Sequence, residues 1–306
     1  MSKPTTFGLY SADITGDCER VLVTLLSSLG PWKTSIFLVG GLAPRYIVKA
    51  RPPAVPPHAG TGGVDVVVDM AVLADTEAYQ TLEQNLKRMG FERGENERGD
   101  KVNWRWKTKT EHGVTMVLEF LAYDPDLGGG KLQELPTKGN ISAVNIPHAS
   151  IVFDLHDTME VTADLLGGAG RATETVAYAN LVSFTCLKAF AFEHRREWKD
   201  AHDLLYCLEH VEGGGDAAAE IFSEALMGKH AEVIGEALTI LARRFTDPVP
   251  DEGYLRDGPV AVARFELDGD DADPEVREQR ALRQRNVSDL IDRFLAGLDF
   301  ALARAR

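Results

Sequence analysis

The chain has little of several features that mark familiar protein classes. Only three of its 306 residues are cysteine, an odd number without metal-ligand spacing, which favours reduced, structural thiols. No window approaches the ~18 consecutive apolar residues of a membrane span, and the N-terminus lacks a basic patch followed by an apolar core, so we expect a cytoplasmic protein without a secretory signal. The 33 lysines and arginines are outnumbered by 47 acidic residues, which argues against nonspecific nucleic-acid binding through phosphates.

Hydrophobic periodicity divides the chain into two parts. Up to about residue 175, helical patterns alternate with β-branched and alternating runs, which include residues 35–41, 64–73, 101–109 and 114–124, with further strand-like pieces at 149–155 and 159–166. After about residue 176 the pattern is helical. We therefore expect an α/β (α+β) protein, with a mixed sheet and flanking helices over residues 1–175 and a helical domain over residues 176–306.

The segment HAGTGGVDVVVDM, residues 58–70, combines glycines with two aspartates in a β-branched run. Alternation on a strand places Gly63, Asp65 and Asp69 on one face, but residues four apart lie ~13 Å apart, so Asp69 fits a strand-end or capping role better than a shared metal site. Glu119 stands in a second apolar strand, where a charge is costly to bury unless it is paired or metal-bound. Either these two strands hold a metal site through Asp65 and Glu119, or the aspartates simply face water on a half-exposed strand.

Four stretches together carry a resemblance to a known family: FLVGGLAPRYIV, HAGTGGVDVVVDM, VTMVLEFLAYD and LKAFAFEHRREWKDAHDLLYCL. Over roughly residues 35–210 the chain resembles the AbiEii-type nucleotidyltransferases, toxins of type IV toxin–antitoxin systems with a polymerase-β-like nucleotidyltransferase fold. The resemblance implies that Gly40 and Gly41 form a phosphate-facing turn. It further implies that Asp65 is the second member of an acidic pair, and that Glu119 is the third acid, which helps deprotonate an attacking hydroxyl.

The resemblance also assigns residues in the helical half. It implies that Lys188 contacts the nucleoside triphosphate and that a second polar cluster comprises Arg195 or Arg196 with Lys199, Asp200 and Asp203. The residues themselves leave simpler alternatives open. A lysine in the apolar stretch around residue 188 either extends to solvent or points into a cleft. Lys199 and Asp203, four residues apart in a helix, form a surface ion pair in the simpler interpretation, and Asp200 is then a first-turn residue favoured by the helix dipole.

The chain departs from the family pattern at residue 63, where an acid is expected and Gly63 stands. Asp65 and Glu119 would then hold one Mg²⁺ but hold two poorly. Three explanations stay open: a degraded member that turns over slowly, assistance from another group such as His58, or a different register in which Asp65 takes the first role and Val67 replaces the second. His194, His202 and His210, eight residues apart, do not stack as a metal pair, and we expect them to be surface or packing residues.

The expected function is transfer of a nucleoside monophosphate from Mg-NTP to a hydroxyl acceptor, either an RNA 3′ end such as that of tRNA or a protein side chain. The resemblance implies a toxin with a separately encoded antitoxin as partner. The alternative is a catalytically degraded protein of the same fold that binds nucleotide or a protein partner. The expected cofactor is Mg²⁺, with a nucleoside triphosphate as substrate, and no membrane partner is expected.

Overall fold

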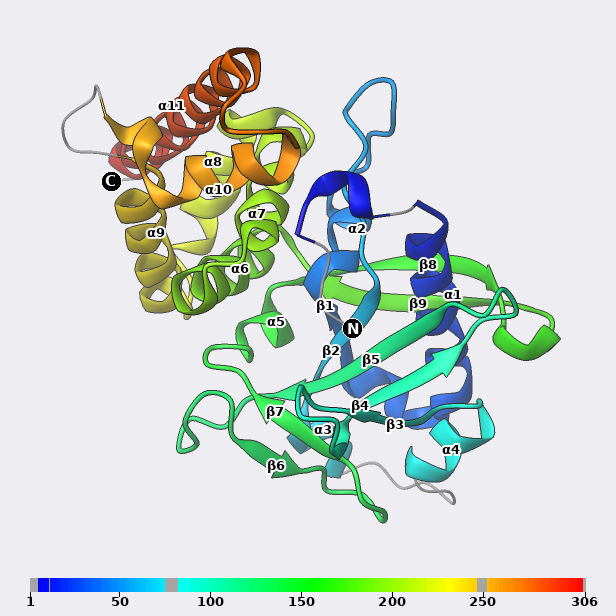
Figure 1. The fold of residues 1–306 in the computed structure, drawn as a ribbon. Coiled ribbons are helices and arrows are strands. Elements are labelled where there is room, and N and C mark those ends of the chain that lie inside the picture. The colour runs from blue at the N-terminus through cyan, green and yellow to red at the C-terminus, as the bar shows by residue number, and fades with distance from the viewer. Residues whose placement is uncertain (1–4, 11, 75–81, 247–251, 305–306) are drawn as a thin grey trace. The chain divides into compact units, whose positions relative to one another are not determined.

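The chain folds into two compact units. The computed structural model describes residues 5–10, 12–74, 82–246 and 252–304 (Figure 1). The sheet unit comprises residues 11–46 and 60–180, and the helical unit comprises residues 1–10, 47–59 and 181–306. Two segments of the N-terminal half therefore belong to the helical unit, which a single boundary near residue 175 does not anticipate. None of the described helices combines the length and the hydropathy needed to cross a bilayer.

The described strands of the sheet unit form one mixed sheet. Its main path runs β3-β4-β5-β2-β1-β9-β8, and β7 pairs with both β5 and β6. Strands β1 and β2 are antiparallel, whereas β2 and β5 are parallel, so the predicted mixed α/β class is confirmed. The strands are β1 (Ile36–Val39), β2 (Gly63–Val68), β3 (Glu92–Glu95), β4 (Lys101–Lys109), β5 (Thr115–Ala122), β6 (Leu132–Glu134), β7 (Ser142–Asn145), β8 (His156–Asp164) and β9 (Arg171–Ala179).

Alternation along the central strands separates a packed face from a more open one. In β5 the residues Met116, Leu118 and Phe120 are buried, while the residues between them, which include Glu119, are half-buried. The long helix α1 (Ala12–Leu29) packs against β2, β8 and β9. The sheet unit also contains the shorter helices α2 (Pro44–Ile47, whose last residue belongs to the helical unit), α3 (Met70–Ala74), α4 (Leu82–Arg88) and α5 (Ile151–Asp154). The apolar face of the sheet is therefore the core of this unit, and polar chemistry is left to the other face.

The helical unit is built from α6 (Leu181–Arg195), α7 (Trp198–His210), α8 (Gly214–Ala225), α9 (Ala231–Phe245), α10 (Asp257–Glu266) and α11 (Pro274–Arg304). Helix α6 packs against α7 and α9, α7 also packs against α10, and α11 packs against α8 and α10 (Figure 1). Edge-to-face packing of Phe222 on Phe294, with ring centroids 5.1 Å apart, fixes α8 against α11. Residues 196 and 197 separate α6 from α7, and these two helices pack side by side.

Some local expectations differ from the structure, and one lies partly outside its described residues. Residues 149–155, expected as a strand, contain α5, because an apolar run this short does not distinguish the two structures. Residues 70–73, expected to continue β2, start α3, because the Asp69 carboxylate accepts the N–H groups of Ala71 and Val72 and caps the helix. The capping role expected for Asp69 is confirmed. The helix expected at 76–91 is seen as α4 from residue 82, and residues 76–81 lie outside the described part.

Removing the largest side chain of the sheet core tests this division into two faces. Trp106 in β4 is fully buried, and its indole N–H donates to the Asn103 carbonyl at 3.1 Å. We expect Trp106→Ala to lower the free energy of unfolding by about 3–5 kcal/mol, measured by urea denaturation. The matched control is Trp104→Ala, which removes a half-buried indole from the same strand and should cost clearly less. Equal losses for the two variants would contradict the assignment of the core.

Candidate functional site

The two predicted carboxylates of the sheet unit lie in one row across neighbouring strands. Asp65 in β2 is in register with Glu119 in the parallel strand β5, and Glu119 is in register with Arg105 in β4. Neighbouring strands are ~4.8 Å apart, and residues in register point to the same face. The sheet therefore brings Asp65 and Glu119 side by side on its more open face.

Asp65 packs directly on the glycine turn that follows β1. Val39, the last residue of β1, pairs with Asp65, so Gly40 comes next to this carboxylate. A Cβ placed on Gly40 would lie 2.1 Å from Asp65 Oδ2, and Gly40 adopts φ +70°, a left-handed conformation that favours glycine. Among the described residues, the Asp65 carboxylate forms no hydrogen bond or ion pair. Gly41 is buried in the short 3₁₀ turn that continues from Gly40.

Glu119 is held by a cation that the sequence analysis did not assign. The Arg105 guanidinium contacts Glu119 Oε1 through Nε at 2.7 Å and through Nη2 at 2.6 Å. Arg105 also donates from Nη1 to the Glu95 carbonyl at 3.0 Å, which fixes the guanidinium over the strand. The Glu119 side chain is 20% exposed. This pair satisfies the condition expected from the sequence, that a carboxylate in an apolar strand needs a positive partner.

The predicted polar residues of the helical unit converge on a buried carboxylate. Asp203 in α7 is fully buried; its Oδ2 accepts from Lys188 Nζ at 2.7 Å, and its Oδ1 accepts from Lys199 Nζ at 2.6 Å. Burial raises the pKa of Asp203, but the charges of Lys188 and Lys199 outweigh that effect and hold this pKa well below its usual range. Lys199 and Asp203 are therefore part of a buried ion cluster and not the surface ion pair of the simpler interpretation.

Lys188 joins α6 to α7 through two aspartates. Its Nζ lies 2.9 Å from Asp200 Oδ1 as well as 2.7 Å from Asp203, and its side chain is 10% exposed. Arg195 donates to both oxygens of Asp200, at 2.6 and 2.8 Å, whereas Arg196 pairs with Asp257. Burial raises the pKa of Asp200, but Lys188 and Arg195 bring it down to about 2. Asp200 does lie in the first turn of α7, as the simpler interpretation expected.

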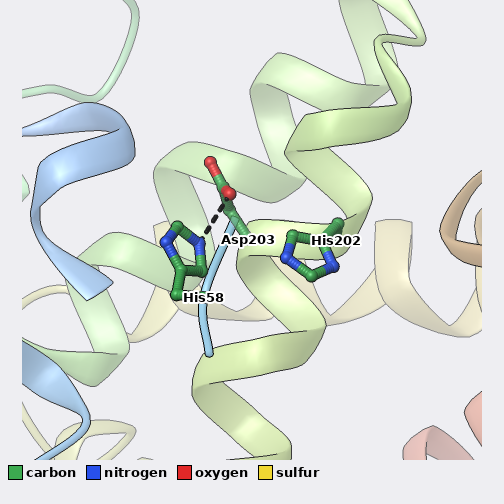
Figure 2. A group of neighbouring side chains, drawn as sticks. All are labelled: His58, His202 and Asp203. Carbon is green, nitrogen blue, oxygen red and sulfur yellow. Dashed lines mark hydrogen bonds and ion pairs between the residues drawn. The ribbon is translucent and has the colours of Figure 1, made fainter. Parts of the chain in front are cut away.

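Two histidines lie beside this cluster (Figure 2). His58, from the proline-rich segment, donates from Nε2 to Asp203 Oδ1 at 2.9 Å, and its side chain is 11% exposed. The ring of His202 stacks near that of His58, with centroids 5.4 Å apart. The Tyr206 hydroxyl donates to the Pro56 carbonyl at 2.9 Å. Segment 47–59 is therefore attached to α7 at two points.

Arg105 and the His58–Asp203 contact could not be assigned from the sequence. The alternation of β4 placed Arg105 on a strand, but the pairing of β4 with β5 decides that it meets Glu119. His58 and Asp203 are 145 residues apart. A proline-rich loop carries no periodicity that indicates its partner, so the only signal was the presence of a histidine near the glycine-rich turn.

Adding a methyl group at Gly40 tests the contact with Asp65. We expect Gly40→Ala to destabilise the protein by more than the ~1–3 kcal/mol of an unfavourable backbone conformation, because the new Cβ also collides with the carboxylate. The matched control is Gly30→Ala: Gly30 has φ +59° but nothing within 4 Å of the added Cβ. Denaturation of both variants isolates the collision, and truncation of Asp65 to Ala in the Gly40→Ala background should recover part of the loss. Equal losses at both glycines would contradict the contact.

The His58 imidazole makes stability depend on pH. Burial lowers the pKa of His58 from 6.5 to about 4, although Asp203 acts in the opposite direction. Between these values the unfolded chain binds a proton that the folded chain does not, so the free energy of unfolding falls as the pH falls from 6.5 to 4, by up to about 3 kcal/mol.

The measurement is urea denaturation at several pH values in metal-free buffer. His58→Gln should flatten this part of the profile, whereas the control His194→Gln, at an exposed position of α6, should leave it unchanged. Parallel profiles for His58→Gln and the unaltered protein would show that His58 does not titrate in this way.

Each unit thus has its own group of candidate residues: the Asp65–Glu119–Arg105 row beside Gly40 in the sheet unit, and a buried cluster around Asp203 in the helical unit. The first presents two hard oxygen donors, and the second presents paired charges with two imidazoles. Comparisons of the chain with protein-family models, with curated proteins and with solved structures find no match.

Proposed function

We propose that the sheet unit binds a Mg-nucleoside triphosphate and transfers its nucleoside monophosphate to a hydroxyl acceptor. The observation that supports this proposal best is the in-register placement of Asp65 and Glu119 beside the Gly40 turn. A phosphate approaching Gly40 meets the Asp65 carboxylate, and two anions at that distance require a cation between them. Mg²⁺ prefers carboxylate and phosphate oxygens, so the donor set fits this ion.

Asp65 and Glu119 are the residues that would hold the ion. Bound Mg²⁺ neutralises triphosphate charge and makes the phosphorus more electrophilic. The Arg105 guanidinium contacts Oε1 of Glu119 through two nitrogens, which orients this carboxylate on the face that it shares with Asp65. In the proposed reaction Glu119 accepts the proton of the attacking hydroxyl, the hydroxyl oxygen bonds to the α-phosphorus, and pyrophosphate leaves. Arg105 orients Glu119 and adds positive charge for the phosphates.

A second candidate function is nucleotide binding without turnover, and two observations favour it. Gly63 provides no carboxylate where the family pattern expects one, and Arg105 already neutralises Glu119. Asp65, which has no hydrogen bond or ion pair among the described residues, then supports one cation, whereas nucleotidyl transfer commonly uses two ions on a shared set of acids. The two candidates share the ligand and differ in whether product forms.

Acceptor and partner are proposed on the resemblance to AbiEii-type toxins. A tRNA 3′ end is the first acceptor to test, because it offers the hydroxyl that the reaction needs. The net charge of −14 disfavours broad phosphate contact, so a single acceptor end is a better fit than an extended nucleic-acid surface. A separately encoded antitoxin is the proposed protein partner.

The decisive measurement is incubation of the full chain with Mg²⁺, each α-³²P-labelled NTP and total tRNA. We expect label transfer that Asp65→Asn and Glu119→Gln each reduce at least ~100-fold, because each removes a charge that stabilises the transition state. The matched control is Asp164→Asn, which neutralises a 70% exposed carboxylate on β8 and should keep full activity. Activity that survives both site variants would remove the proposal.

Replacement of Gly63 separates the two candidates. A Cβ at residue 63 would lie 3.3 Å from the Val117 carbonyl, a tight but tolerable approach, and Gly63 shares a face with Asp65. If the chain binds nucleotide by calorimetry but transfers no label, a gain of transfer in Gly63→Asp and none in Gly63→Ala supports the binding-only candidate. Absence of Mg²⁺-dependent nucleotide binding in all three proteins excludes both candidates.

A further inference from the structure

The helical unit contains a group of metal-ligating side chains that the proposed nucleotide chemistry does not use. One nitrogen of His58, one nitrogen of His202 and one carboxylate oxygen of Asp203 lie within 4.8 Å of one another (Figure 2). His58 comes from segment 47–59, and the other two are consecutive in α7. Two imidazoles and one carboxylate form a donor set that borderline divalent transition ions prefer.

His202 is already oriented as a ligand. Its Nδ1 lies 2.9 Å from Glu266 Oε1, so this nitrogen carries the proton and donates to the carboxylate. Nε2 is then a lone-pair acceptor; it is buried and has no hydrogen-bond partner among the described residues, and the residue is 2% exposed. A buried acceptor without a partner is costly, and a carboxylate that fixes the tautomer of a histidine is the usual support of a metal-binding imidazole.

His58 and Asp203 supply the other donors. His58 Nε2 now donates to Asp203 Oδ1. A metal ion between them would replace this hydrogen bond with one bond to His58 Nε2 and one to Asp203 Oδ1, after Nε2 has lost its proton. Ligands of a tetrahedral ion with bonds of ~2.1 Å lie ~3.4 Å apart, so the donor atoms must approach one another by up to about 1.4 Å. Rotation of the His58 ring, which is carried by an irregular segment, can provide part of that movement.

Lys199 is the main competitor for this position. Its ammonium lies 2.6 Å from the same oxygen, Asp203 Oδ1, and 2.9 Å from Oδ2, which Lys188 also contacts. A divalent ion therefore has to displace Lys199 or share Asp203 with it, and the nearby positive charge weakens binding. The competition provides a test, because removal of Lys199 should strengthen a real metal site and should not strengthen accidental binding elsewhere.

We infer that His58, His202 and Asp203 form a binding site for a divalent transition ion such as Zn²⁺, which fastens segment 47–59 to α7. The remaining coordination position is left to water or to an external ligand. This site uses none of the residues proposed to hold Mg²⁺, Asp65 and Glu119, and the inference stands whether or not the sheet unit transfers nucleotides.

The test uses the full chain, freed of metal by a chelator and titrated with Co²⁺ and with Zn²⁺ in competition with a chromophoric chelator. We expect one equivalent to bind, with a Co²⁺ visible spectrum and an X-ray absorption signature of imidazole ligands. His58→Ala and His202→Ala should each weaken binding at least tenfold, and Glu266→Gln should weaken it ~10–100-fold through the orientation of His202. Lys199→Met should tighten binding about tenfold.

The matched control is His194→Ala, in an exposed position of α6, which should bind as the unaltered protein does. Circular dichroism of each metal-free variant identifies loss of fold, and the imidazole signature in the unaltered protein does not depend on any variant. Absence of Co²⁺ and Zn²⁺ binding overturns the inference, as does an affinity that neither histidine replacement changes. Weaker binding in Lys199→Met would exclude Asp203 Oδ1 as a ligand and overturn the site as described.

Discussion

The cost of keeping a carboxylate away from water governs both units of this protein. Asp203 is fully buried and is held by Lys188, Lys199 and His58, so it connects α6, α7 and segment 47–59 through one side chain. Removing any one cation from such a cluster leaves charge unpaired in a poorly solvated place, which is far more costly than the loss of a surface pair. The same rule places Arg105 on Glu119 in the sheet. Asp65 differs, because its carboxylate has no hydrogen bond or ion pair among the described residues. The proposed cation is therefore placed beside Asp65.

Local sequence patterns were enough to predict which residues share a face of a strand, but not which strands pair with one another. The sequence placed Asp65 and Glu119 on strands and implied a turn at Gly40 and Gly41. In the structure, Glu119 alternates with the buried residues of β5, and the Gly40 turn meets Asp65. The pairing of β2 with β5 makes the two carboxylates adjacent. It depends on the order of strands in the sheet, which the sequence of neither strand predicts. Arg105 shows the same limit, since its partner depends on a third strand.

In the helical half, a correctly predicted helical spacing did not reveal whether the residues are exposed or buried. Lys199 and Asp203 do lie one turn apart on α7, but contacts from α6 and from segment 47–59 convert that pair into part of a buried cluster. Helical periodicity cannot reveal this, because both partners on other elements are distant in sequence. From its spacing to His194 and His210, His202 was expected to be a surface or packing residue. It becomes a candidate metal ligand because His58, 144 residues earlier in an irregular segment, lies beside it.

The insertion of residues 47–59 into the helical unit has a consequence for how the chain is synthesised. These thirteen residues leave the ribosome early, yet their partners in α7, Asp203 and Tyr206, follow about 150 residues later. Contacts of such long sequence separation form slowly. The segment lacks these partners until α7 has been synthesised, so completion of the helical unit is coupled to the last part of translation. Neither unit corresponds to a continuous gene fragment.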